Sequence, residues 1–62
     1  MPDVTELKGH AVALRLHLDA VLEELRFYVA NNGNEQLKPF VEDQVREFET
    51  VWAAFKEALA EV

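Results

Sequence analysis

The apolar residues of this chain form two stripes that mirror each other about Gly33, and this pattern constrains the fold more than any other feature. In the first half, apolar residues recur in alternating steps of three and four at Val4, Leu7, Ala11, Leu14, Leu18, Val21, Leu25 and Tyr28. In the second half, the same alternation gives Val41, Val45, Phe48, Trp52, Phe55, Leu59 and Val62. Such steps place residues on one face of an α-helix, whereas a half-buried strand would alternate every second residue. The sequence therefore predicts two amphipathic helices.

Folding the chain back at Gly33 brings the two stripes into register. Leu25 then lies opposite Val41 near the turn, and small Ala11 lies opposite large Phe55, the alternation of sizes that a packed core prefers. The predicted fold is all-α, an antiparallel helical hairpin, in a single domain spanning residues 1–62.

The helix ends are predicted from capping and turn residues. Asp3 followed by Glu6 has the spacing of a capping box, which favours a helix start. The run 31–34, Asn-Asn-Gly-Asn, ends this helix, because Gly33 can adopt the left-handed conformation and Asn34 can cap the next segment. The second start leaves two alternatives, a loose first turn over 35–38 or a helix that begins near Pro39. We expect helices over about 4–31 and about 35 or 39 to 61, with a turn at about 32–34.

A hairpin of this size needs additional stabilisation. A chain of 62 residues buries only ~60% of its unfolded surface, and no cysteine is present to form a disulfide. The apolar stripes are also wider than a two-helix contact covers, so we expect a symmetric dimer that forms a four-helix bundle. A helical subunit from another protein, giving a hetero-oligomeric assembly, is the alternative. The residues predicted to form the dimer core are Leu14, Leu18, Phe48, Trp52 and Phe55.

The charge balance limits the classes of partner. The net charge is −6, which disfavours non-specific binding to nucleic acid or anionic lipid. No apolar run approaches the ~20 residues of a membrane span, and the N-terminus lacks the basic start of a signal peptide. We therefore expect no membrane partner and a cytoplasmic location.

The usual catalytic nucleophiles are missing, apart from Thr5, Thr50 and the lysines. There is no serine, no cysteine and no glycine-rich phosphate loop, so we expect neither an enzyme nor a bound cofactor. His10 and His17 share one heptad position, but two helical turns separate them by ~10 Å, too far for one metal ion. We expect both to be boundary residues beside the core and predict no metal site.

Aromatic residues near the turn are the best candidates for a partner site. Phe27 and Phe40 fall outside the two stripes and lie close to Tyr28 and Leu37. Aromatic side chains are enriched at binding hot spots, so these four residues form the predicted partner-binding site. The alternative is that Phe27 and Phe40 only cap the end of the bundle.

These features indicate a small acidic interaction or regulatory module that binds itself and another protein. Lys8 and Arg15 share a heptad position, and Arg26 lies on the adjacent strip of the helix surface, which makes a short basic stripe. Asp19 and Glu23 interrupt this stripe. The chain length and hairpin-dimer outline are similar to those of plasmid copy-number regulators of the Rop type, which bind paired RNA loops through their first helices. This resemblance is one of architecture, with no motif matched residue by residue, and it implies RNA binding as the alternative function.

Overall fold

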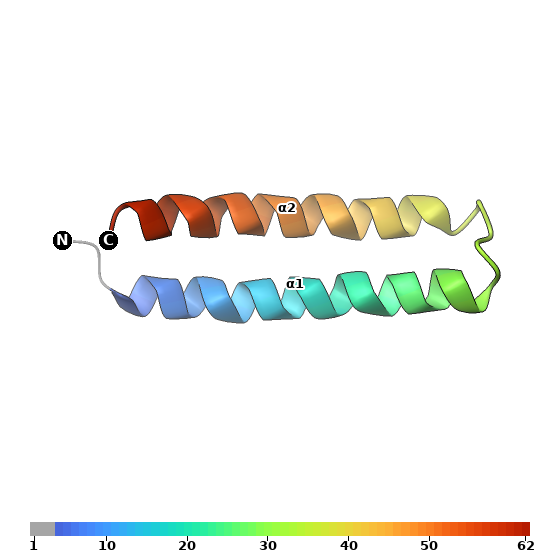
Figure 1. The fold of residues 1–62 in the computed structure, drawn as a ribbon, viewed down its shortest axis with the longest axis horizontal. Helices are drawn as coiled ribbons and strands as arrows, with labels where there is room; N and C mark the ends of the chain where they lie inside the picture. Colours follow the sequence, from blue (N-terminus) through green and yellow to red (C-terminus); the bar gives the residue numbers. More distant parts are fainter. Residues whose placement is uncertain (1–3) are drawn as a thin grey trace.

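The computed structural model describes residues 4–62, which fold into two helices that lie side by side and run in opposite directions (Figure 1). Helix α1 spans Val4–Ala30 and helix α2 spans Lys38–Ala60. The Cα trace is a rod with extents of 48 × 14 × 10 Å. The predicted all-α hairpin is confirmed.

The end of α1 is a Schellman motif, in which two backbone N–H groups beyond the helix satisfy carbonyls of its last turn. Gly33 N donates to Tyr28 O at 3.0 Å, and Asn32 N donates to Val29 O at 3.0 Å. Gly33 has φ +70°, as the sequence predicts, but Asn32 at φ +60° is the residue that ends the helix. Asparagine tolerates this left-handed conformation better than most residues. Two consecutive left-handed residues therefore reverse the chain.

The start of α2 combines the two alternatives left open by the sequence. The Asn34 side chain accepts a hydrogen bond from Gln36 N at 2.9 Å, and Leu37 N donates to Asn34 O at 2.9 Å, so 34–37 form a turn. The helix begins at Lys38, with Leu37 as an N-cap that makes no side-chain capping bond. Pro39 sits in the first helical turn, where its missing N–H costs nothing. Asn34 thus caps the turn at 34–37 that precedes α2, and not the helix itself. At the other end of the chain, Asp3 of the predicted capping box lies outside the described residues.

The two glycines should respond to alanine with opposite signs. Gly9→Ala should raise the free energy of unfolding by about 0.5–1 kcal/mol, because Gly9 is inside α1 and a Cβ there meets nothing within 4 Å. Gly33→Ala should lower it by about 1–2 kcal/mol, because an added Cβ disfavours the left-handed φ. Urea denaturation at one fixed protein concentration measures both. A stabilising Gly33→Ala would contradict the turn geometry.

The faces that the helices turn toward each other differ in part from the predicted stripes. In α1 the half-buried residues repeat every three and four as Leu7, His10, Leu14, His17, Val21, Glu24 and Tyr28, with Ala13 and Ala20 beside them. In α2 they are Val41, Gln44, Val45, Phe48, Val51, Phe55 and Ala58. Leu18, predicted on the inner stripe of α1, is exposed, and His17 takes the inner place. The stripe that faces α2 is thus rotated by part of a turn from the most apolar stripe.

Candidate interaction surfaces

The hairpin leaves its apolar side chains largely in contact with solvent. Within residues 4–62, none falls in the fully buried class. The exposed large hydrophobic residues are Val4, Val12, Leu16, Leu18, Leu22, Leu25, Phe27, Val29, Phe40, Trp52, Leu59 and Val62. Contiguous exposed apolar surface is rare on monomers and marks interaction sites. The candidate functional sites of this chain are therefore surfaces on the outside of the hairpin.

The helical repeat divides these surfaces into two flanks. Leu14 and Phe48 each face the other helix, and the residues four positions further on, Leu18 and Trp52, lie toward one flank. The residues one position before an inward-facing residue lie toward the other flank, as Phe27 does before Tyr28. Because the helices are antiparallel, equivalent positions of α1 and α2 share the same side of the pair. Each flank is therefore built from both helices.

The first flank, here termed the apolar flank, has an uncharged strip next to the inner face, bordered further out by charged residues such as Arg15 and Glu49. Leu18 is 44% exposed and Trp52 is 43% exposed, although both are large residues predicted for a core. Leu22 and Val29 widen the flank on α1. The residues four positions after an inward-facing residue are Ala11, Leu18, Leu25, Val45, Trp52 and Leu59. No charged side chain occurs among them.

Aromatic rings contact one another along α2, next to the apolar flank. The ring centroids of Phe48 and Trp52 are 6.5 Å apart with nearly parallel planes, and those of Trp52 and Phe55 are 5.6 Å apart and tilted. These separations lie in the range at which aromatic pairs attract each other. Trp52 is held between two rings of its own helix while its outer surface remains uncovered.

The second flank carries a hollow near the turn, with a volume of about 360 Å³. It is lined by Glu23, Glu24 and Phe27 of α1, by Leu37 just before α2, and by Phe40 in the first turn of α2. Phe27 and Phe40 are each 56% exposed, whereas Leu37 is half-buried. Of the four residues predicted as a partner site, the structure brings these three together.

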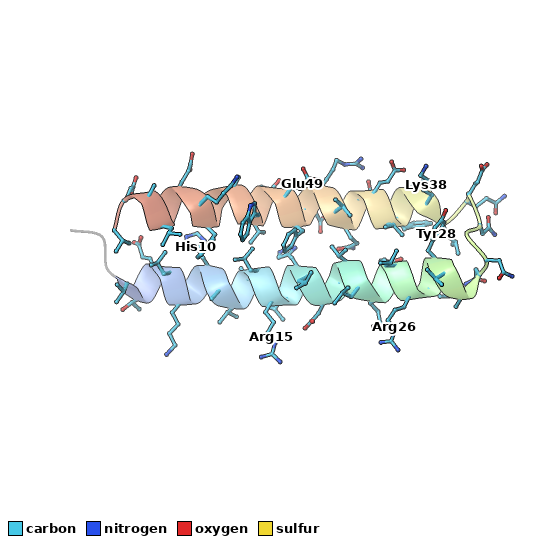
Figure 2. The ribbon with its side chains drawn as sticks, viewed as in Figure 1. His10, Arg15, Arg26, Tyr28, Lys38 and Glu49 are labelled. Atoms are coloured by element: carbon cyan, nitrogen blue, oxygen red, sulfur yellow. The ribbon has the colours of Figure 1, made fainter. Side chains whose placement is uncertain are left out.

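Tyr28, the fourth predicted residue, is not among the residues that line the hollow. Its side chain points into the space between the helices at the loop end (Figure 2). Gly33 lies close to the Tyr28 ring. A Cβ atom at position 33 would be 3.5 Å from the Tyr28 hydroxyl oxygen. Tyr28 therefore supports the turn that holds the two phenylalanines.

The flank that carries the hollow, here termed the acidic flank, has negative side chains toward both of its ends. The helical repeat places there Glu6, Glu23, Asp43, Glu47, Glu57 and Glu61, and Glu24 of the inner face also lines the hollow. Asp43 is paired with Arg46 of the same helix. None of the six lysine and arginine residues of the chain occupies a position on this flank. The negative charge of the protein is thus concentrated on the side that carries the hollow.

The basic residues of α1 lie away from the acidic flank. Arg15 and Arg26 both point away from α2 (Figure 2). Leu22 and Asp19 interrupt the stripe between them, and Leu22 belongs to the apolar flank. The first helix therefore presents scattered positive charges and no continuous basic face.

The histidines are closer to the interior than the sequence predicts. His10 lies between the two helices (Figure 2), and His10 and His17 are both half-buried. Glu24 continues the same heptad position. Among residues 4–62, no group of three or more potential metal-binding side chains is close enough to hold a metal ion.

The two glutamates of the hollow are the site residues that sequence reasoning missed. Glu23 and Glu24 read as solvated residues of a helix surface, yet both line the hollow with Phe27. The available signal was spacing, because Glu23 and Phe27 are four residues apart and therefore neighbours on a helix.

Comparison with protein-family models, with curated proteins and with solved structures finds no match to this chain. In the part of the chain that the structure describes, neither helix is long and apolar enough to cross a membrane.

Proposed function

We propose that this chain is a small acidic protein-protein interaction module that acts as a homodimeric four-helix bundle and performs no catalysis. The observation that supports this proposal is the apolar flank, where Leu18, Leu25 and Trp52 remain exposed in a single hairpin. A second copy that packs its own apolar flank against the first covers these residues in both chains.

The exposed area supports association of the expected size. The chain exposes 4965 Å², whereas a compact monomer of its mass of 7.1 kDa exposes about 4,100 Å². The excess is roughly 900 Å², close to the ~800 Å² that each partner buries in an interface of standard size.

Charge selects which flank the second copy covers. Two apolar flanks facing each other bring Leu18 and Trp52 of both copies together, and the charged residues that border this flank, such as Arg15 and Glu49, are of both signs. Two acidic flanks facing each other would oppose glutamates such as Glu23 and Glu47, and like charges disfavour such an arrangement. A symmetric dimer through the apolar flank therefore leaves the acidic flank free for another protein.

The concentration dependence of thermal unfolding tests this proposal. If folding is coupled to dimerisation, the melting temperature followed by circular dichroism rises steadily as the protein concentration increases from about 1 to 100 μM. The same melting temperature over this range, with an unchanged helical signal, would contradict the dimer and favour a folded monomer.

A further inference from the structure

We propose that the hollow near the turn and the acidic flank together form a docking site for a basic amphipathic helix of another protein. This inference rests on the proposed interaction function and adds the chemistry of the partner. The partner helix would place one apolar side chain in the hollow and lay its lysine and arginine residues along the acidic flank.

The apolar part of the site is formed by the two phenylalanines. Phe27 comes from the end of α1 and Phe40 from the start of α2, and both line the hollow together with half-buried Leu37. A volume of about 360 Å³ is at the small end of the range of ligand pockets, which suits single side-chain anchors. Phenylalanine faces also attract cations, so a lysine or arginine next to the anchor gains a further contact.

The charged part of the site selects the sign of the partner. Glu23 and Glu24 border the hollow, Glu47 lies on the same flank of α2, and Glu57 and Glu61 add negative charge at the far end of the flank. With no lysine or arginine placed on this side, only the Arg46 that pairs with Asp43 offsets any of this charge. Complementary potentials steer a cationic partner to this flank and repel nucleic acid, anionic lipid and a second copy of this chain.

The shape of the flank favours a helix as the occupant. The two helices run along the long dimension of the 48 Å rod, so the acidic flank is a long, narrow surface with the hollow near one end (Figure 1). An amphipathic helix docks along such a surface with anchors spaced three and four residues apart.

The test uses a fluorescein-labelled synthetic 14-residue peptide of leucine and lysine, with leucines spaced three and four apart, and the full-length protein. Fluorescence anisotropy should show saturable binding that weakens at higher salt, and a matched leucine–glutamate peptide should not bind. Phe40→Ala should raise the Kd of the lysine peptide about 30-fold, the effect of truncating a binding hot spot.

Charge variants separate a specific site from general attraction. The pair Glu23→Gln and Glu24→Gln should weaken peptide binding about tenfold or more. The matched control pair, Glu42→Gln and Glu49→Gln, removes the same charge from positions of α2 outside the acidic flank and should change the Kd by less than about twofold. Circular dichroism of every variant checks that helicity is retained.

Three results would overturn the docking site. These are no binding of the lysine peptide, equal weakening by the two pairs of glutamine variants, or an unchanged Kd in Phe40→Ala. NMR amide shifts on peptide addition provide an independent map and should centre on residues 23–27 and 37–40. If the wild-type protein is a monomer that still binds the peptide at this site, the proposed dimer is contradicted and the docking site is supported. Failure of the dimer and failure of the docking site are therefore distinguishable.

Discussion

Leu18→Glu should abolish dimerisation and remove most of the helical signal at micromolar concentration. Leu18 lies in the middle of the apolar flank, 44% exposed in one hairpin and covered in the proposed dimer. Symmetry places the new carboxylate in the interface twice, and an uncompensated buried charge costs about 3–5 kcal/mol. Sedimentation velocity and circular dichroism measure the two effects.

Val12→Glu is the matched control for this substitution. Val12 is an exposed apolar residue of the same helix, but the helical repeat places it on the side of α1 opposite to α2. The control variant should therefore remain a dimer with unchanged helicity. If Leu18→Glu also remained a folded dimer, the apolar flank would not be the interface.

Leu14→Ala should have the second largest effect and lower the free energy of unfolding by about 2–5 kcal/mol. Leu14 is half-buried on the face that α1 turns toward α2, and a second copy would enclose it further. Removing its side chain leaves a cavity that the two rigid helices cannot close. Urea denaturation at a fixed protein concentration measures the loss, and the dimer dissociation constant should rise with it.

Leu16→Ala provides the comparison, because Leu16 is 64% exposed and lies on neither the inner face nor the apolar flank. Its effect should stay within about 0.5 kcal/mol, as for most surface substitutions. Equal losses for Leu14→Ala and Leu16→Ala would show that the inner face of α1 has been assigned to the wrong residues.

The sequence was sufficient to predict the hairpin because two independent signals agree. The spacing of apolar residues specifies two helices, and the run Asn31-Asn32-Gly33-Asn34 specifies the reversal between them. The role of Asn32 as the residue that ends α1 was missed. Glycine is the most common left-handed residue at the end of a helix, so the sequence points to Gly33 as the residue that ends α1. In the structure both Asn32 and Gly33 have positive φ.

The face that α1 turns toward α2 could not be read from hydrophobicity. Leu14 and Leu18 are equally apolar, but Leu14 faces α2 and Leu18 faces outward. A helix that packs against its partner helix and also against a second copy needs apolar residues on two faces. The periodicity of apolar residues does not indicate which of the two faces each residue lies on. His10 and His17 occupy inner positions for the same reason, because the most apolar stripe lies on the apolar flank.

The candidate partner site was predictable in its aromatic part and not in its charged part. Phe27 and Phe40 fall outside the stripes and next to the turn, so their proximity follows from the hairpin alone. Glu23 and Glu24 become part of the hollow only once the rotation of α1 is known. Glutamates on a helix are usually solvated, and a sequence gives no reason to single out these two.

Sedimentation equilibrium of the unmodified protein tests the central claim, a dimer through the apolar flank, most directly. At micromolar concentrations we expect a single species with twice the chain mass of 7.1 kDa, and dissociation only on dilution. A single species of 7.1 kDa that keeps its helical signal and unfolds cooperatively would contradict the claim, because the hairpin would then be stable with Leu18 and Trp52 exposed.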